Sequence, residues 1–490
     1  MTQCDYTYRE YLRRTWGIGD DGPLAEGLSL RDGRLTLGGQ VDLSELVRRY
    51  GAPLEVAFCP QVGAQIGRML GWAAQARQAA GYAGRFIYAY ATKANYAAEA
   101  VGAALAAGAH YETSAATDVW IARQLWEAGR LSGERYIFCN GSKDAAYLRA
   151  LLALRAAGHT RVVPIIDDLD ELAFYLAQDV PPLLLGVRER RADGGRFGLT
   201  PAEIPEAAAM IAESPHRLVL YHAMVGSQIE DAAWWTAQLA RSAEAYARLR
   251  QVAPSLHMFD FGGGMPTGSY RLDFAFDYQG FLTELMRMLA ATCGAYGVPE
   301  PDLVGEFGRY TVASHSVYLL EVGAVKAGLP GEPAWYLLNG SLMVALPDML
   351  IVPDQQFVVL PLSGWDAPAA EVRLAGRHTC DSDDCYPRPG RQPLVLPASG
   401  RGLVVAVAGV GAYQQALSGR GGAHHCLAPE PRRIVIEEDL DGLVIRDLAP
   451  PSPGATIAQL GYPREEWGWL EPLPARASQA ALRPRVPQMS

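Results

Sequence analysis

Lys93 is one of only three lysines in a chain of 490 residues, in which arginine supplies the other 40 of 43 basic residues. A lysine amine can lose its proton near neutral pH and attack a carbonyl carbon to form a Schiff base, which a guanidinium cannot do. Lys93 lies in the apolar, aromatic run 85–96, which is typical of a buried strand that ends at the lysine. The run alone equally permits a surface lysine at a strand end.

Three further segments carry groups that bind phosphate. Gly262–Gly264 follow the apolar run 258–261, and three glycines let backbone N–H groups approach an anion closely; a tight turn is the alternative. The segments 226–228 (Gly-Ser-Gln) and 306–309 (Glu-Phe-Gly-Arg) also end strand candidates, and they add a serine hydroxyl and an arginine. If these groups share one face with Lys93, they predict pyridoxal 5′-phosphate as the cofactor.

An alternation of strands and helices would place these segments on one face. Up to about residue 310, short apolar runs alternate with alanine-rich helical stretches, which predicts an α/β fold with a (β/α)8 TIM-like barrel. Such barrels keep their sites at the carboxyl ends of the strands. The alternative is a doubly wound open sheet, but no glycine-rich turn follows the first strand. The strand candidates are 86–91, 108–113, 135–139, 161–166, 183–188, 217–224, 257–261 and 302–305, and the helical candidates include 61–80, 116–128, 143–156, 202–212 and 232–252.

The pattern changes after residue 311 to short strands separated by Gly/Pro turns, which predicts a C-terminal all-β domain, a sandwich or a barrel. The segment 28–37 alternates around Asp-Gly and predicts a hairpin. We therefore expect an N-terminal arm at 1–24, a cofactor-binding barrel at 50–310, a β domain made of 25–49 plus 311–448, and a Pro/Arg-rich tail at 449–490.

Composition restricts the class of protein. The length predicts two or three domains, and 49% hydrophobic with 20% charged residues is typical of a soluble enzyme with a large core. A net charge of −10 gives no electrostatic case for nucleic-acid binding, and no apolar run is long enough to span a bilayer. Seven scattered cysteines and the lack of a secretory signal predict a reducing cytoplasm. We expect no metal, because His424-His425-Cys426 is too compact to chelate one.

Seven motifs resemble, in the same order, those of the barrel-type (fold type III) pyridoxal-phosphate decarboxylases, the family of ornithine, diaminopimelate and biosynthetic arginine decarboxylases. They are Tyr90–Asn95, Arg196–Gly198, Gly226–Gln228, Asp260–Gly264, Glu306–Arg309, Cys380–Asp384 and Gly411–Tyr413. The resemblance extends over about residues 25–420. The segments 139–144, 354–357 and 411–414 resemble the arginine branch more closely, although this chain is shorter than typical members of that branch.

The resemblance implies a role for each matching residue. Lys93 would form the Schiff base, and Glu306 would pair with the pyridine nitrogen, whose protonation deepens the electron sink for a carbanion at the substrate Cα. Cys380, unless it is an ordinary turn cysteine, would reprotonate Cα from the partner subunit of a homodimer with shared sites. Asp381 or Asp384 would hold a distal cationic group of the substrate. The other implied cofactor contacts are Glu112, Arg188, Ser227, Gly263, Gly264, Gly308, Arg309 and Tyr413.

One position departs from the family pattern. Members usually place a histidine two residues before the glycine of Gly-Ser, stacked on the cofactor ring, and this chain has Met224 there. A thioether can pack on an aromatic face but cannot titrate. His222 lies two residues earlier on the same strand face, displaced by about 6–7 Å. It is either a partial replacement that contacts the ligands or an ordinary core histidine.

The predicted function is a pyridoxal-phosphate-dependent decarboxylase of a basic or diamino-acid-type substrate, in polyamine synthesis or in a specialised pathway. A racemase or another enzyme that transforms Cα with the same cofactor is the first alternative, and Met224 leaves room for it. A non-catalytic relative that regulates a true decarboxylase is the second. The motif around Cys380 argues against a racemase, and the retained Lys93, glycines and Arg309 argue against a non-catalytic relative.

Overall fold

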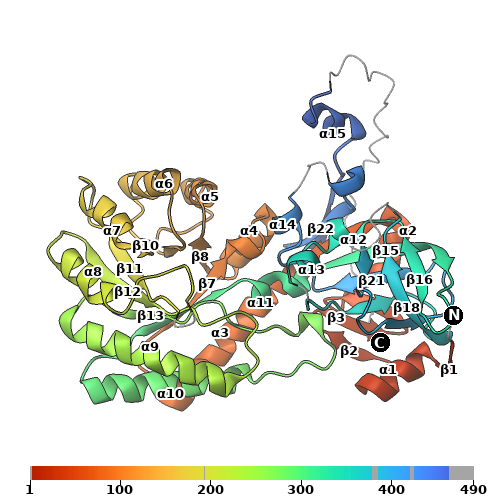
Figure 1. Cartoon of the computed structure of the whole chain (residues 1–490), viewed down its shortest axis with the longest axis horizontal. Helices are drawn as coiled ribbons and strands as arrows, with labels where there is room; N and C mark the ends of the chain where they lie inside the picture. Colours follow the sequence, from red (N-terminus) through yellow and green to blue (C-terminus); the bar gives the residue numbers. More distant parts are fainter. Residues whose placement is uncertain (1–2, 192–193, 353, 378–383, 420–423, 463–490) are drawn as a thin grey trace. The chain divides into compact units, whose positions relative to one another are not determined.

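A computed structural model describes residues 3–191, 194–352, 354–377, 384–419 and 424–462 of the chain. Its contacts divide the chain into two compact units. The first unit consists of Met1–Val62, Thr267–Phe274 and Val312–Ser490, and the second of Gly63–Pro266 and Ala275–Thr311. Each unit is described by itself below (Figure 1).

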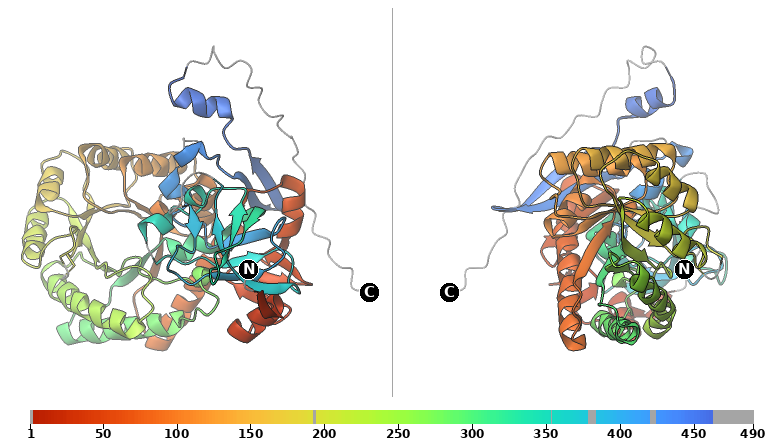
Figure 2. Two further views of the ribbon diagram at one scale, coloured as in Figure 1. Left: turned by 45° about the vertical axis from the view of Figure 1, so that its right-hand side comes forward. Right: turned by 90° about the vertical axis from the view of Figure 1, so that its left-hand side faces the viewer.

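The second unit is a closed barrel of eight parallel strands in the order β10-β11-β12-β13-β14-β7-β8-β9 (Figures 1 and 2). All eight strand candidates of the sequence occur, which confirms the predicted (β/α)8 barrel. The strands are β7 (Phe86–Ala91), β8 (His110–Thr113), β9 (Ile137–Cys139), β10 (Val162–Ile166), β11 (Leu184–Arg188), β12 (Arg217–His222), β13 (Met258–Asp260) and β14 (Asp302–Phe307). Apolar side chains fill the barrel, among them Ile87, Phe138, Val163, Ile165, Val219, Met258 and Val304.

Aspartates begin four of the helices that follow these strands. The carboxylates of Asp144, Asp168, Asp231 and Asp277 each accept a backbone N–H from the first turn of α6, α7, α9 and α10. Because of these caps, the loops that follow the carboxyl ends of the strands stop at defined residues. The helices are α3 (Pro60–Ala80), α4 (Ala98–Ala106), α5 (Ala116–Glu127), α6 (Ala145–Ala156), α7 (Leu169–Leu176), α8 (Glu203–Ala212), α9 (Ala232–Val252), α10 (Tyr278–Tyr296) and α11 (Arg309–Val312).

The first unit is mostly β. One sheet has the strand path β1-β18-β16-β15-β6-β22-β23, with β17, β19, β20 and β21 paired off it, and a second sheet has the order β2-β3-β4-β5. The strands are β1 (Gln3–Thr7), β2 (Gly22–Ala25), β3 (Leu28–Arg31), β4 (Arg34–Leu37), β5 (Val41–Asp42), β6 (Leu54–Phe58), β15 (Ser316–Lys326), β16 (Ala334–Leu338), β17 (Val359–Pro361), β18 (Pro368–Ala375), β19 (Cys385–Tyr386), β20 (Leu394–Pro397), β21 (Val404–Ala408), β22 (Arg432–Asp439) and β23 (Gly442–Leu448).

Short helices interrupt this unit, so it is mostly β and not all-β. They are α1 (Tyr8–Trp16), α2 (Leu43–Tyr50), α12 (Leu342–Ala345), α13 (Asp348–Ile351), α14 (Gln415–Ser418) and α15 (Pro453–Gln459). The hairpin predicted at 28–37 is present as β3 and β4. Asp32 and Gly33 connect the two strands with φ of 51° and 71°, which suits the two-residue turn that twists with its strands.

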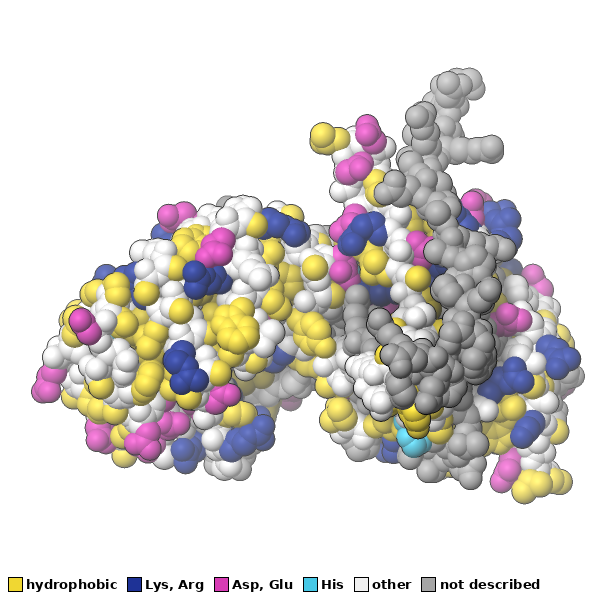
Figure 3. Space-filling view, turned by 90° about the horizontal axis from the view of Figure 1, so that it is seen from above, with side chains coloured by type: hydrophobic (Ala, Val, Ile, Leu, Met, Phe, Trp, Pro, Cys, Tyr) yellow, Lys and Arg dark blue, Asp and Glu magenta, His cyan; other side chains and the backbone are white. Residues whose placement is uncertain are grey.

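Both ends of the chain differ from a simple arm and tail. Within 1–24, β1 pairs with β18, and Thr7 and Glu10 form a capping box at the start of α1. Within 449–490, α15 begins at Pro453, and residues 463–490 lie outside the described residues. No helix of the described residues is long and apolar enough to cross a membrane. The face in Figure 3 carries acidic and basic side chains interspersed, with no extended basic patch.

Candidate active site

Lys93 stands just beyond the carboxyl end of β7, in the short 3₁₀ turn Thr92–Ala94. Thr92 Oγ1 donates to the carbonyl oxygen of Glu112 at 2.9 Å and to Asp118 Oδ2 at 2.5 Å, which ties this turn to the end of β8. The Lys93 side chain is 47% exposed, and its Nζ lies 3.5 Å from Glu112 Oε1. A reachable amine therefore stands beside a fully buried carboxylate.

A single amide connects that carboxylate to a second one. Asn140, which directly follows β9, donates from Nδ2 to Glu112 Oε1 at 2.9 Å and to Glu306 Oε1 at 2.7 Å. On the far side of Glu306, His222 Nε2 lies 3.3 Å from Oε2. The polar groups thus form a continuous chain from Lys93 through Glu112, Asn140 and Glu306 to His222. In the sequence, Asn140 stood out only as part of the segment 139–144; its position directly after a strand candidate, like that of Lys93, was the available signal for its role.

The strand register aligns the remaining polar residues of this chain. Arg188 pairs with His222 across β11 and β12, and His222 pairs with Asp260 across β12 and β13. One ligand atom each from His222, Asp260 and Glu306 lies within 4.8 Å of the others. The guanidinium of Arg188 lies over the Phe197 ring, 5.1 Å from its centroid. Cationic, acidic and imidazole groups therefore meet at one end of the barrel.

Burial separates the pKa values of the carboxyl groups. It raises the pKa of Glu112 to about 7, although Lys93 opposes the shift, and it raises the pKa of Asp260 well above its usual value. Burial would also raise the pKa of Glu306, but His222, Lys93 and the hydrogen bond from Asn140 lower it to about 2. Burial lowers the pKa of His222, against the attraction of Glu306. A pKa of about 2 leaves Glu306 an anion at neutral pH, whereas burial favours the protonated form of Asp260.

The glycine turn after β13 has no room for side chains. Gly262 has φ of 74°, and a Cβ added at Gly263 would lie 2.3 Å from the carbonyl oxygen of Glu306. Gly264 accepts a hydrogen bond from Ile229 N–H at 3.0 Å, which packs the 226–229 loop on the turn. Met224 Sδ accepts the Gly263 N–H at 3.4 Å. Met224 therefore contacts the proposed phosphate-binding turn itself, a position that the sequence alone did not indicate.

Three further predicted cofactor residues follow barrel strands. Ser227 is exposed in the loop after β12, in the segment that packs on the glycine turn. Gly308 follows β14 directly, and Arg309 begins α11. They lie at the carboxyl end of the barrel, where such folds carry their sites.

The residues present fit pyridoxal phosphate. Among the described residues, several buried polar atoms of this cluster have no hydrogen-bond partner, namely Glu112 Oε2, Asn140 Oδ1, Arg188 Nε, His222 Nδ1 and Asp260 Oδ2. Buried polar atoms are normally paired, so this group of unpaired atoms indicates a polar ligand. An ionised Glu306 suits a protonated ring nitrogen, a crowded glycine turn suits a phosphate, and the Lys93 amine suits an aldehyde.

Four predicted residues belong to the first unit or lie outside the description. Tyr413 has a positive φ of 61° in the loop before α14. Asp384 is buried, and its Oδ1 accepts from Ser341 Oγ at 3.1 Å and from the backbone N–H of Leu342 at 2.6 Å, at the start of α12. In this structure Asp384 therefore contacts the first turn of α12. Cys380 and Asp381 lie outside the described residues.

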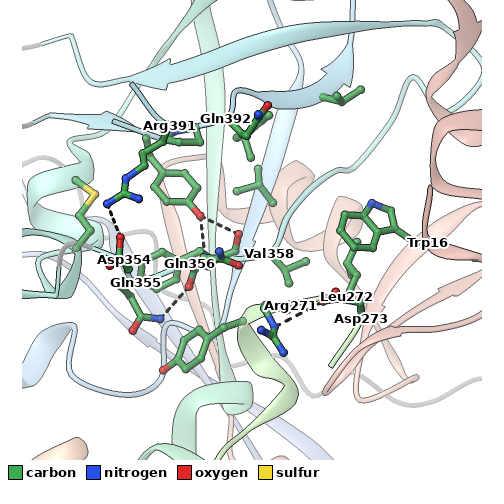
Figure 4. A pocket seen from close by; sticks show the side chains of 18 of the residues that line it. Trp16, Arg271, Leu272, Asp273, Asp354, Gln355, Gln356, Val358, Arg391 and Gln392 are labelled. Carbon is green, nitrogen blue, oxygen red and sulfur yellow. Dashed lines mark hydrogen bonds and ion pairs between the residues drawn. The ribbon is translucent and has the colours of Figure 1, made fainter. Parts of the chain in front are cut away.

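The first unit has a cavity of its own, of about 800 Å³ (Figure 4). The segment 354–357, which resembles the arginine branch, lines it, and Asp354 forms an ion pair with Arg391 there. Arg271 Nε lies 3.6 Å from Asp273 Oδ1 on another wall. No lysine lines this cavity. We therefore place the candidate active site at the barrel and not here.

The comparisons identify the family. Residues 72–313 match the model of the pyridoxal-dependent decarboxylase, pyridoxal binding domain. The matched region belongs to this domain family, and it includes Lys93, Glu112, Asn140, the glycine turn and Glu306. The barrel is thus a pyridoxal-binding domain, as the residue motifs had predicted.

Curated relatives include biosynthetic arginine decarboxylases. That of Yersinia pestis is 27% identical over 324 residues, which cover 60% of this chain and 49% of the relative. That of Rhodopirellula baltica is 28% identical over 228 residues, which cover 42% and 34%. The chain spans about half or less of the length of the curated relatives it matches.

Solved structures show the same fold. The biosynthetic arginine decarboxylase of Campylobacter jejuni superimposes with a TM-score of 0.79 at 20% identity, covering 93% of this chain and 91% of that one. Diaminopimelate decarboxylase of M. jannaschii gives 0.74 at 19% identity, covering 90% and 99%. The lysine/ornithine decarboxylase of Vibrio vulnificus gives 0.60 at 22% identity, covering 76% and 92%.

Proposed function

We propose that the chain is a pyridoxal-phosphate-dependent decarboxylase that acts on a basic or diamino-acid-type substrate. The observation that carries the proposal is the chain of polar contacts from Lys93 through Glu112 and Asn140 to an ionised Glu306, at the carboxyl end of a pyridoxal-binding barrel. When bound, pyridoxal phosphate accepts the electron pair that remains on the substrate Cα as carbon dioxide departs.

The charge and position of each protein residue indicate its role in the proposed reaction. Glu306, ionised at neutral pH, holds a proton on the ring nitrogen. Gly264 and Arg309 would supply N–H donors for the phosphate, in a turn whose Gly263 N–H donates to Met224 Sδ. Lys93 supplies the nucleophilic amine, and Glu112, whose pKa of about 7 lets it exchange a proton near neutral pH, stands 3.5 Å from that amine.

The substrate class is inferred from the relatives. Those reported above carry the names arginine, diaminopimelate and lysine/ornithine decarboxylase, and all of these amino acids have a second nitrogen group. With Asp384 occupied at α12, Asp381 remains the residue that we propose for the distal cationic group. We also propose a cytoplasmic homodimer in which Cys380 and Asp381 of each subunit complete the partner's site, with Cys380 as the acid that reprotonates Cα.

Substitution of the lysines tests this function. The protein incubated with pyridoxal phosphate is expected to show a visible absorbance band, and Lys93→Ala and Lys93→Arg are expected to lack it, because neither side chain is a competent nucleophile. Lys326→Ala, which changes an exposed lysine at the end of β15, is the matched control and should keep the band. A normal band in Lys93→Ala would contradict the role of Lys93.

Carbon dioxide release tests the reaction itself. Arginine, ornithine, lysine and diaminopimelate would be supplied in turn to the cofactor-loaded protein, with Lys93→Ala as the blank. Release from one or more of them is expected. Racemisation or another Cα reaction without carbon dioxide release would overturn the assignment as a decarboxylase while leaving the cofactor site intact.

A further inference from the structure

Asn140 donates from one amide nitrogen to two buried carboxylates of the candidate site. We propose that it is a positioning residue whose amide holds Glu112 and Glu306 together and favours the ionised form of both. The inference rests on the proposed function, because Glu306 is the proposed partner of the ring nitrogen. Nothing in the motifs or the family match assigns this role to Asn140.

The geometry leaves the amide one orientation. A single nitrogen, Nδ2, donates to Glu112 Oε1 at 2.9 Å and to Glu306 Oε1 at 2.7 Å. If the amide were turned over, its oxygen would face two carboxylate oxygens with no hydrogen between them, which is repulsive. Asn140 is only 5% exposed, so water cannot take its place without a cavity opening. The two donated hydrogens are therefore specific to an amide at this point.

The loop that carries Asn140 is anchored by the second lysine of the chain. The side chain of Lys143 is fully buried, and its ammonium donates to the carbonyl oxygens of Gly141 at 2.9 Å and Ile165 at 2.7 Å. It also forms an ion pair with Glu171 at 2.8 Å. At the other end of the loop, Asn140 N–H donates to the carbonyl oxygen of Thr113 at 3.0 Å. Both flanks of Asn140 are thus fixed to neighbouring strands.

Removal of the amide would change the charge state of the site. Without Nδ2, the two carboxyl groups would lose a shared donor and would face each other directly in a buried environment. Like charges in such a place raise each other's pKa, and the loss of a hydrogen bond to the charged form adds to the increase. The other charged or titratable groups that face them are Lys93 after β7, Asp118 on α5, Arg188 on β11, His222 on β12 and Asp260 on β13.

The consequence for the cofactor follows from Glu306. A carboxylate holds a proton on the ring nitrogen only while it is itself ionised. Asn140 contributes to that ionised state, which His222 and Lys93 also favour, and it keeps the pKa of Glu112, beside Lys93, from rising above about 7. The amide therefore connects the two ends of the cofactor site: the nitrogen end at Glu306 and the lysine end at Glu112.

Two variants and a control in the same loop test the role. Asn140→Leu keeps the approximate shape and removes both donors, and Asn140→Ser keeps one hydroxyl donor should the leucine variant fail to fold. Asp144→Ala removes only the N-cap of α6, where Asp144 accepts from Tyr147 N–H at 2.8 Å. The readouts are the dissociation constant of pyridoxal phosphate and the pH midpoint of its bound absorbance band, neither of which requires turnover.

We expect Asn140→Leu to weaken cofactor binding at neutral pH by about tenfold and to raise the pH midpoint by about one unit, the size of shift that a lost charge-assisted hydrogen bond produces. Asn140→Ser should lie between this variant and the wild type. Asp144→Ala should lower the melting temperature and leave both the dissociation constant and the pH midpoint unchanged, because the role of Asp144 is only structural. An unchanged pH midpoint in the Asn140 variants would overturn this inference but not the proposed function. A wild-type protein that fails to bind pyridoxal phosphate overturns the proposed function and the inference together.

Discussion

Replacement of Lys143 by methionine is expected to destabilise the barrel strongly. Lys143 and Glu171 form an ion pair of 2.8 Å whose side chains are 0% and 3% exposed. Methionine fills a similar volume, so packing changes little, but it leaves the Glu171 carboxylate with only the Asp167 N–H, at 3.3 Å, as a donor. Breaking a buried pair from one side typically costs about 3–5 kcal/mol.

The other contacts of Lys143 favour a loss of stability in the upper part of that range. Besides the ion pair, the variant loses the hydrogen bonds to the buried carbonyl oxygen of Ile165 and to that of the half-buried Gly141. A buried acceptor without a partner costs about 1–3 kcal/mol. For a unit of this size the total corresponds to a decrease in melting temperature on the order of 10 °C.

Urea unfolding monitored by circular dichroism measures the loss, and Lys143→Met/Glu171→Leu is the compensating variant. Replacing both partners of a buried pair by apolar groups is often neutral, so the double variant should recover most of the stability. The reasoning is refuted if the single variant loses less than about 1 kcal/mol, or if the double variant is as unstable as the single one.

The pH dependence of the loss gives a second check with a defined sign. Burial raises the pKa of Glu171 even in the presence of Lys143, and removal of the ammonium raises it further. A folded state with a raised carboxyl pKa is favoured by protonation. The deficit of Lys143→Met should therefore be smallest in acid, below the usual carboxyl pKa, and should grow as the pH rises through the raised pKa of Glu171.

Two further predictions concern the cofactor site. Because the folded pKa of Glu112 is raised to about 7, its contribution to the stability of the cofactor-free protein should be complete below its usual pKa and lost as the pH rises through 7. Glu112→Gln should remove this change in a melting series across neutral pH, and a series as steep as that of the wild type would contradict the assignment. Gly263→Ala would place a Cβ 2.3 Å from the carbonyl oxygen of Glu306, so it should displace the turn and weaken pyridoxal-phosphate binding at least tenfold in an absorbance titration, at a cost of about 1–3 kcal/mol in stability. Unchanged binding in this variant would show that the turn does not hold the phosphate.

Local periodicity was sufficient to predict the barrel. Each strand is a short apolar run and each helix a longer alanine-rich stretch, and these signals arise within single segments. The same holds for the hairpin at 28–37, because Asp32 and Gly33 adopt the positive φ that such a turn requires. The rare Lys93, at the end of one of these runs, indicated the lysine end of the site for the same reason.

Contacts between distant segments were beyond the sequence. The side chain of Asn140 bonds to carboxylates that are 28 and 166 residues away in the chain. The residues next to Asn140 in the sequence therefore could not indicate these contacts. The partners of Asp384 near Ser341 likewise lie more than 40 residues earlier in the chain, so the acidic run around it did not indicate them.

The amino-acid sequence by itself determined the (β/α)8 barrel, the position of the candidate lysine and the family of the pyridoxal-binding domain, because strand and helix periods and short motifs are local properties of the chain. Only the tertiary structure decided which polar groups meet. Closure of the barrel brings the ends of β7, β8, β9 and β14 together, and this joins Lys93, Glu112, Asn140 and Glu306 in one network. The charge state of that network follows from burial and from distances of about 3 Å, which no spacing along the chain encodes.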